Sequence, residues 1–199
     1  MKWEFYSTYQ ERVQNDVQLG TFLFSHVFLD CTHVKKETSP IAHKKEREMK
    51  VIVAAAGTAG HINPGLAIAN KIKQEEKDSK IIFIGTTRGL ENDLVTRAGY
   101  ELKTIEAYGL SKKLTIDNIK KMWKTVKGYG QAKKIVQEFK PDIVIGTGGY
   151  ICGATISAAH SLKIPTMLHE SNSFPGRAVK FLAKKTNTIL VSFQDAIPR

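Results

Sequence analysis

The chain has only two cysteines, Cys31 and Cys152, which stand far apart and lack the spacing of a metal or redox motif. This scarcity excludes a disulfide framework and indicates a reducing compartment. No apolar run approaches the roughly 20 residues that a membrane-spanning helix needs. The best local candidate, FLFSHVFL at 22–29, is short, contains a histidine and has no small-residue cleavage site after it. The sequence therefore predicts neither a signal peptide nor a membrane anchor.

Two familiar nucleotide-binding glycine loops are also missing. No segment reads G-x-x-x-x-G-K-[ST], which excludes a P-loop. The glycine turn AAAGTAG at 54–60 does not have the G-x-G-x-x-G spacing. The apolar run after it ends in Gly85-Thr86-Thr87 without the acidic residue that binds ribose, which disfavours a nicotinamide dehydrogenase.

Acidic residues are scarce in the larger part of the chain. Residues 1–48 hold seven Lys/Arg and seven Asp/Glu, whereas residues 49–199 hold 23 against 12 and so carry the whole net charge of +11. This excess fits a phosphate-bearing ligand, an anionic membrane surface or nucleic acid, and solubility alone is an equally good explanation. We expect no nucleic acid partner, because no recognition motif or interleaved aromatic platform is present.

Residues 1–48 contain one glycine, no clear repeat and a terminal charged run, HKKEREMK, and Met49 then leads directly into an apolar strand pattern. We expect residues 1–48 to be an extension outside the core fold and residues 49–199 to form one domain. In that domain strand patterns alternate with helix patterns, which predicts a Rossmann-like parallel α/β sheet with helices on both faces. The strands are expected within 50–57, 80–85, 101–107, 141–149, 164–172 and 187–193. The helices are expected within 63–76, 89–100, 115–140 (one helix, or two broken near Gly128), 150–163 and 175–185.

Three segments fall at the carboxyl ends of predicted strands, where such sheets bind ligands: Gly57–Gly60, Thr147–Tyr150 and His169–Asn172. A glycine turn that opens a helix favours phosphate, and two such turns suit a diphosphate. The glycines could instead serve turn geometry alone. His61 follows the first turn and has three open roles: proton acceptor for a sugar hydroxyl, phosphate partner, or packing of the first helical turn.

The segment 108–140 holds nine lysines against two acidic residues. Among these lysines an apolar stripe recurs at helical spacing: Ile116, Ile119, Met122, Trp123 and Val126. The favoured interpretation is an ordinary stripe facing the core, with a solvated lysine face. The alternative is a basic amphipathic patch that rests on an anionic bilayer.

Four segments, GTAGHINPGLAIA, GLENDLV, KPDIVIGTGGY and IPTMLHESN, occur in this order. Together they resemble the N-terminal half of the MurG family in glycosyltransferase family 28, over roughly residues 49–199. That family transfers N-acetylglucosamine from UDP-N-acetylglucosamine to lipid I, the undecaprenyl-diphosphate-linked muramoyl-pentapeptide, with inversion at the anomeric centre. The resemblance implies the acceptor-binding half of a two-domain GT-B fold, no cofactor and no metal. It also implies a peripheral position on the cytoplasmic face of the bacterial cell membrane.

The resemblance assigns roles to particular residues. His61 is implied as the catalytic base or transition-state stabiliser. The implied contacts with UDP-N-acetylglucosamine are Thr58, Ala59, Gly60 and Asn172, and those with the acceptor diphosphate are Gly57, Gly148, Gly149, Tyr150 and Glu170. The implied membrane patch is Ile119, Lys120, Lys121, Met122, Trp123 and Lys124.

Two positions depart from the family pattern. Ala59 stands where the family has a glycine, so a methyl narrows the backbone approach and a positive φ would be costly there. Ser171 replaces a glutamine. The family's donor-binding domain is absent from these 199 residues. We therefore expect a missing domain or partner subunit and no activity of this chain alone. The alternative is a non-catalytic lipid-diphosphate binding module or one subunit of a split glycosyltransferase.

Overall fold

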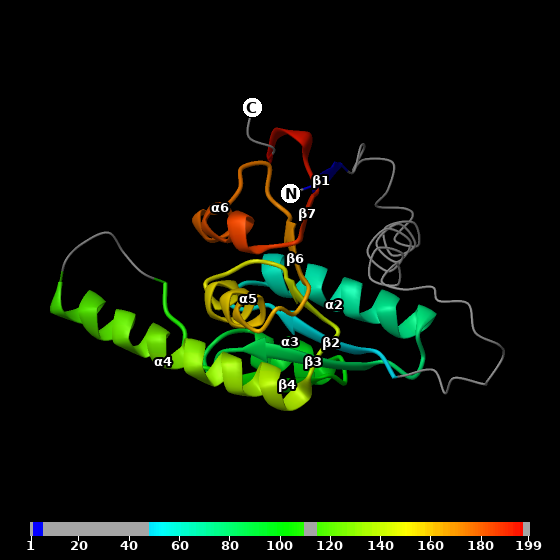
Figure 1. The fold of residues 1–199 in the computed structure, drawn as a ribbon, viewed down its shortest axis with the longest axis horizontal. Coiled ribbons are helices and arrows are strands. Elements are labelled where there is room, and N and C mark those ends of the chain that lie inside the picture. The colour runs from blue at the N-terminus through cyan, green and yellow to red at the C-terminus, as the bar shows by residue number, and fades with distance from the viewer. Residues whose placement is uncertain (1, 6–47, 110–114, 197–199) are drawn as a thin grey trace.

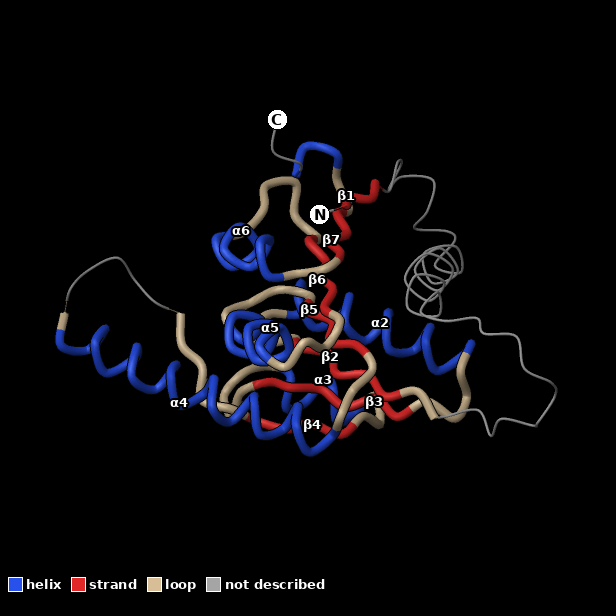
Figure 2. The backbone as a smooth tube through the Cα atoms, viewed as in Figure 1, coloured by secondary structure: helices blue, strands red, loops and turns tan. Residues whose placement is uncertain are grey.

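The computed structural model describes residues 2–5, 48–109 and 115–196, and places seven parallel strands in one sheet (Figures 1 and 2). The strand order is β1-β7-β6-β5-β2-β3-β4. The strands are β1 (Lys2–Phe5), β2 (Lys50–Ala54), β3 (Lys80–Gly85), β4 (Glu101–Thr104), β5 (Ile143–Gly146), β6 (Thr166–Glu170) and β7 (Thr188–Val191). The helices are α2 (Ala59–Glu75), α3 (Glu91–Arg97), α4 (Ile116–Phe139), α5 (Ile151–Ser161) and α6 (Arg177–Leu182), with short 3₁₀ turns at Ala183–Lys185 and Gln194–Ala196.

Helices cover the sheet on both faces, which is why its central strands are almost continuously apolar. Successive side chains of β2 point to opposite faces, so Val51 and Val53 pack with α2 and α3, while Ile52 and Ala54 pack with α4, α5 and α6. Both sets are fully buried. The predicted Rossmann-like sheet with two helical layers is confirmed.

The sheet also includes a strand that the sequence did not predict. β1 lies at the edge and pairs in parallel with β7, from Lys2 opposite Thr188 to Phe5 opposite Val191. Residues 6–47, most of the predicted extension, lie outside the described part of the chain. The domain division at Met49 therefore stays a prediction.

Helix α4 is one continuous helix, which decides between the two alternatives that the sequence left open. Its C-terminal half packs against α5 through the buried Ala132 and Val136, and its N-terminal half projects beyond the sheet (Figure 1). On that projecting half the side chains of Met122, Trp123 and Val126 are 50%, 70% and 58% exposed. The core-facing interpretation of the apolar stripe is wrong for these three residues, because no sheet lies beneath them. The side chains of Ile116 and Ile119 lie outside the described part.

Gly128 marks the point where α4 touches the chain that follows β4. A Cβ atom at this buried glycine would overlap the carbonyl oxygen of Glu106, whereas a Cβ atom at Gly130 would meet nothing. The helix and the segment around Glu106 can therefore lie this close only because residue 128 has no side chain.

We predict that Gly128→Ala lowers the free energy of unfolding by about 1–3 kcal/mol, because the added methyl group overpacks a backbone contact. Gly130→Ala, on the same helix, is the matched control and should raise it by about 0.5–1 kcal/mol through helix propensity. Urea unfolding followed by circular dichroism measures both changes. Equal effects of the two substitutions would contradict the close approach.

Candidate functional site

Strands β2 and β5 lie side by side in the sheet although about 90 residues separate them in the sequence. From β2 the chain continues through β3 and β4 toward one edge, and from β5 through β6 and β7 toward the other. The strand order thus reverses between β2 and β5. The loops that leave these two strands flank the position where open α/β sheets bind ligands.

The loop after β2 is hydrogen-bonded to the carboxylate of Glu91, a fully buried residue at the start of α3. Gly57, at φ +97°, donates its N–H to Oε2 of Glu91 at 3.0 Å. The other oxygen, Oε1, accepts the N–H of Thr86 at 2.8 Å and its hydroxyl at 2.7 Å. Burial favours the neutral acid and by itself would raise the pKa of Glu91. The hydrogen bonds from Thr86 and Gly57 outweigh burial and hold that pKa below its ordinary value.

Backbone N–H groups at the two loops have no partner within the described residues. In the first loop these are the N–H groups of Thr58, Ala59 and Gly60, where α2 begins without a side-chain cap. In the second loop they are those of Gly149 and Tyr150, just before α5. Unsatisfied donors at a helix N-terminus, together with the helix dipole, favour an anion. Two such termini therefore lie at the ends of adjacent strands.

The ring of His61 packs between the two loops. A Cβ atom on Gly148 would overlap this ring, and one on Gly149 would come within 2.6 Å of the carbonyl oxygen of Ala56. These glycines have φ of +121° and +79°. The hydroxyl of Thr147 adds a hydrogen bond to the carbonyl oxygen of His61 at 2.7 Å. Gly148 is therefore needed to admit the ring of His61, and Gly149 to admit the carbonyl group of Ala56.

The orientation of the His61 ring decides which nitrogen can do chemistry. Nδ1 is buried and has no hydrogen-bond partner in the described part of the molecule. The ring as a whole is half-buried. Nε2 is consequently the nitrogen available to accept a proton from a bound hydroxyl group.

The third segment, at the end of β6, is organised by the buried carboxylate of Glu170. Its Oε1 accepts both the N–H and the side-chain amide of Asn172, at 2.9 and 2.7 Å. Its Oε2 accepts the N–H of Gly176, the N-cap residue of α6, at 2.9 Å. Glu170 thus holds both the backbone N–H and the side-chain amide nitrogen of the exposed Asn172.

A proline in α2 connects the first and third segments. The N–H of residue 64 would normally donate to the carbonyl oxygen of Gly60, but Pro64 has no N–H. That oxygen instead accepts a weak hydrogen bond from the hydroxyl of Ser171 at 3.4 Å. Pro64 is the sixth residue of α2, so it lies deeper in the helix than the first-turn position where proline costs least.

Two buried side chains beside the loops have shifted pKa values that keep both of them uncharged at neutral pH. Burial lowers the pKa of His169 to about 4, although the charge of Glu170 opposes this shift. Burial raises the pKa of the Cys152 thiol to about 12, and its sulfur lies 3.4 Å from the carbonyl oxygen of Ala54 and 3.1 Å from that of Gly148. A neutral imidazole and a protonated thiol in these positions serve packing and hydrogen bonding.

The three segments predicted at strand ends do converge, since His61 contacts the second loop and Gly60 contacts Ser171. Ala59 is the first residue of α2 and does not have a positive φ, so the expected backbone cost of alanine is absent. The predicted membrane patch lies apart, on α4. Of its members only Met122, Trp123 and Lys124 have described side chains, and all three are exposed.

Sequence reasoning missed Glu91, although it lies in the segment GLENDLV. An acidic residue in the first turn of a helix is ordinarily explained by the helix dipole. No sequence signal separates Glu91 from such a residue, because its contact with Gly57 arises only when β3 pairs with β2.

We predict that Glu91→Ala lowers the free energy of unfolding by about 2–5 kcal/mol, because three donors then lose their buried acceptor. Asp93→Ala is the matched control on the same helix. Its ion pair with Arg97 is largely exposed, so its loss should cost under about 1 kcal/mol. Chemical denaturation of the two variants provides the measurement. A loss at Glu91 as small as that at Asp93 would show that the carboxylate is not holding the loop.

Comparison with known proteins matches residues 51–191 to the N-terminal domain of glycosyltransferase family 28. The chain is 48% identical over 151 residues to the UDP-N-acetylglucosamine–N-acetylmuramyl-(pentapeptide) pyrophosphoryl-undecaprenol N-acetylglucosamine transferase of Clostridioides difficile, covering 76% of this chain and 37% of that protein. It is 50% identical over 148 residues to the transferase of the same name from Lactococcus lactis subsp. cremoris, covering 74% and 42%.

Among solved structures, Acinetobacter baumannii MurG superposes with a TM-score of 0.67 at 28% identity, over 76% of this chain and 43% of that one. The chain therefore spans about two fifths of the length of the relatives it matches.

Proposed function

The chain belongs to glycosyltransferase family 28, and on that premise we propose that it is the acceptor-binding part of an N-acetylglucosamine transferase. The donor is UDP-N-acetylglucosamine and the acceptor is the muramoyl-pentapeptide carried on undecaprenyl diphosphate. These are the compounds in the names of the relatives. In this proposal the nucleotide part of the donor is bound by a portion of the transferase that these 199 residues do not include.

The observation that carries this proposal is the pair of open helix N-termini at the switch point. The N–H groups of residues 58–60 and 149–150 have no partner in the described structure and lie at the ends of two adjacent strands. Two neighbouring anion sites match the two phosphate groups of a diphosphate. The N–H of Gly57 is already donated to Glu91, so we assign this residue to holding the loop rather than to the phosphate.

The proposed chemistry is a single displacement at the anomeric carbon of N-acetylglucosamine. A hydroxyl oxygen of the muramoyl sugar forms the new bond as the bond to the UDP oxygen breaks, and UDP leaves with the electron pair. Nε2 of His61 accepts the hydroxyl proton, which makes His61 the general base. Glu170 holds the amide nitrogen of Asn172, and we assign the side-chain oxygen of Asn172 to a hydrogen bond from a sugar hydroxyl or amide.

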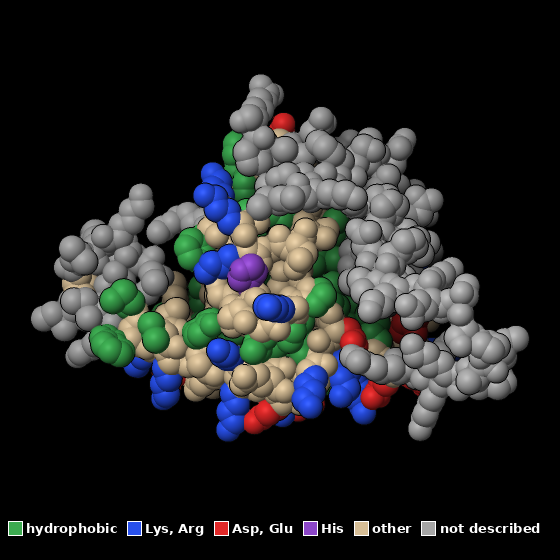
Figure 3. All heavy atoms as spheres, in the orientation of Figure 1, with side chains coloured by type: hydrophobic (Ala, Val, Ile, Leu, Met, Phe, Trp, Pro, Cys, Tyr) green, Lys and Arg blue, Asp and Glu red, His purple; other side chains and the backbone are tan. Residues whose placement is uncertain are grey.

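We also propose that the protein rests on the cytoplasmic face of the bacterial membrane through the projecting half of α4. Exposed Met122, Trp123 and Val126 lie there among Lys124 and Lys127. In Figure 3, apolar side chains gather at the projecting end of α4, beside a row of Lys and Arg side chains. Apolar side chains that enter the interface, flanked by lysines that meet anionic headgroups, are the features of peripheral binding. Within the described residues, no helix is long and apolar enough to cross a bilayer.

The acceptor role is tested by measuring how tightly the 199-residue chain binds a labelled muramoyl-pentapeptide on undecaprenyl diphosphate in detergent. Gly148→Ala pushes a methyl group into the ring of His61 and should weaken binding at least tenfold. Gly153→Ala, in α5 where a Cβ atom meets nothing, is the matched control and should bind as the parent does. Circular dichroism confirms that both variants fold. Undiminished binding by a folded Gly148→Ala variant would refute the proposed diphosphate site.

The membrane role is tested by sedimentation with lipid vesicles. Binding should rise with the fraction of anionic lipid and fall with added salt, because charge attraction is screened. Met122→Ser combined with Trp123→Ser should reduce binding at every lipid composition, while Leu90→Ser, an exposed apolar residue outside α4, should not. Binding that ignores both salt and lipid charge would argue against this surface.

A further inference from the structure

A pocket of about 650 Å³ shares Trp123 and Lys124 with the predicted membrane patch and is not part of the glycine-loop site. Three segments build it: the turn after β3, the chain at and after β4, and one face of α4. Its lining residues are Thr87, Arg88, Thr104, Ile105, Glu106, Tyr108, Trp123, Lys124, Lys127 and Gln131. This volume is in the range of small-molecule sites.

The pocket has an excess of two positive charges. Lys127 pairs with Glu106, Nζ to Oε1 at 3.0 Å. The hydrogen bond from Lys127, aided by the charges of Lys124 and Arg88, holds the pKa of Glu106 below its ordinary value. Arg88 and Lys124 have no ion-pair partner within the part of the chain that the structure describes. Two cations in one pocket are therefore left to meet a negative ligand.

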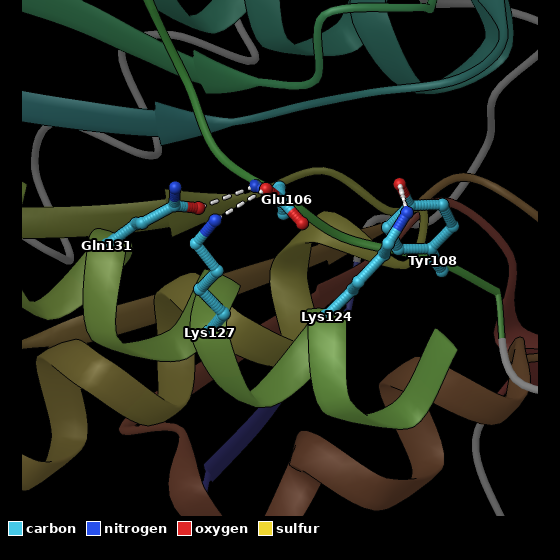
Figure 4. A network of polar contacts seen from close by, with 5 residues as sticks. All are labelled: Glu106, Tyr108, Lys124, Lys127 and Gln131. Carbon is cyan, nitrogen blue, oxygen red and sulfur yellow. Dashed lines mark hydrogen bonds and ion pairs between the residues drawn. The ribbon is translucent and has the colours of Figure 1, made fainter. Parts of the chain in front are cut away.

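Tyr108 contacts both of these cations, and Figure 4 shows its contact with Lys124. The guanidinium of Arg88 lies 4.2 Å from the centroid of the Tyr108 ring, and Nζ of Lys124 lies 5.3 Å from it and 3.5 Å from the hydroxyl oxygen. Arg88 also donates to the carbonyl oxygen of Ala107 at 3.4 Å. Cations positioned before a ligand arrives lose less side-chain entropy on binding it.

The backbone wall of the pocket is fixed as well. Gln131 accepts the N–H of Glu106 through its side-chain oxygen at 2.7 Å (Figure 4). The close contact of Gly128 with the carbonyl oxygen of Glu106 presses α4 against the same segment. Gln131 and Gly128 thus fix the backbone on one side of the pocket, while most of its lining side chains, Arg88 and Lys124 among them, are exposed to solvent.

The pocket and the glycine loops both lie at the carboxyl ends of the strands. The first loop follows β2, and the pocket follows β3 and β4, the next two strands in the sheet. Neighbouring strands are about 5 Å apart, so the pocket lies about 5–10 Å from the first loop in the direction across the strands. Thr86 connects the two places, because its hydroxyl donates to Glu91 beneath the loop and accepts the N–H of Arg88 at 3.4 Å. A ligand bound at the loops can reach the pocket with a short extended chain.

We propose that this pocket binds a carboxylate of the peptide carried by the acceptor, in the first place its C-terminal carboxylate. The inference rests on the proposed acceptor role. An extended pentapeptide spans about 16–18 Å, more than the separation along the sheet edge. Arg88 and Lys124 supply charge-assisted hydrogen bonds to the carboxylate, and Tyr108 supplies apolar surface for the adjoining side chain.

The test titrates the 199-residue chain with soluble N-acetylmuramoyl-pentapeptide, which has neither lipid nor diphosphate, by isothermal calorimetry. The same compound with its C-terminal carboxylate amidated is the matched ligand. We expect amidation to weaken binding at least tenfold. Arg88→Gln and Lys124→Gln should weaken binding of the carboxylate form to the level of the amide. Lys134→Gln, an exposed lysine of α4 outside the pocket, should leave it unchanged.

Equal affinity for the carboxylate and amide forms would overturn the proposal, as would unchanged affinity in both Arg88→Gln and Lys124→Gln. Lys124 is exposed on a helix, so its variant remains informative if Arg88→Gln fails to fold. A vesicle arm separates the other source of a negative group. Loss of anionic-vesicle binding in Arg88→Gln without any peptide binding would assign the pocket to a lipid headgroup and overturn the proposal. Failure of the diphosphate test at Gly148 concerns the loops alone, because this titration contains no diphosphate.

Discussion

The carboxylate of Glu91 is the interaction on which the ligand-binding edge of the sheet depends. It joins the ends of β2 and β3 by accepting three hydrogen bonds with a fully buried side chain. By taking the N–H of Gly57, it sets the direction in which the next three N–H groups point. By taking the hydroxyl of Thr86, it also positions the turn that carries Arg88. One buried negative charge thereby organises both of the surfaces that we propose to bind anions.

Much of this architecture was predictable because it follows from local pattern. Apolar runs separated by helical periods predict a parallel sheet, and the carboxyl ends of its strands predict where the glycine turns and His61 meet. Glu91 was not predictable in this way, because its burial follows only from β3 bringing Thr86 beside Gly57. The exposure of Trp123 was not predictable for a related reason. An apolar stripe shows which residues share one face of a helix, but it does not show whether another element packs on that face. β1 is a four-residue strand in a segment without pattern.

The two proposed binding places divide the acceptor by its chemistry. The glycine loops offer backbone N–H groups and helix dipoles, which suit compact phosphate oxygens. The pocket by α4 offers side-chain cations on an aromatic wall, which suits a carboxylate on a chain. The exposed half of α4 adjoins that pocket. In this proposal α4 contacts the lipid surface, the pocket binds the peptide and the glycine loops bind the diphosphate, all at the same side of the sheet. His61 lies between the two glycine loops, next to the phosphate end.

Pro64 leaves the carbonyl oxygen of Gly60 without its usual helical donor. The hydroxyl of Ser171 donates weakly to that oxygen and so joins the first and third segments. Another residue at position 64 would bring back an N–H, and because a carbonyl oxygen has two lone pairs, that N–H would share the oxygen with Ser171 and not displace it. A substitution chosen to strengthen α2 would therefore also restrict the direction from which Ser171 approaches the first segment.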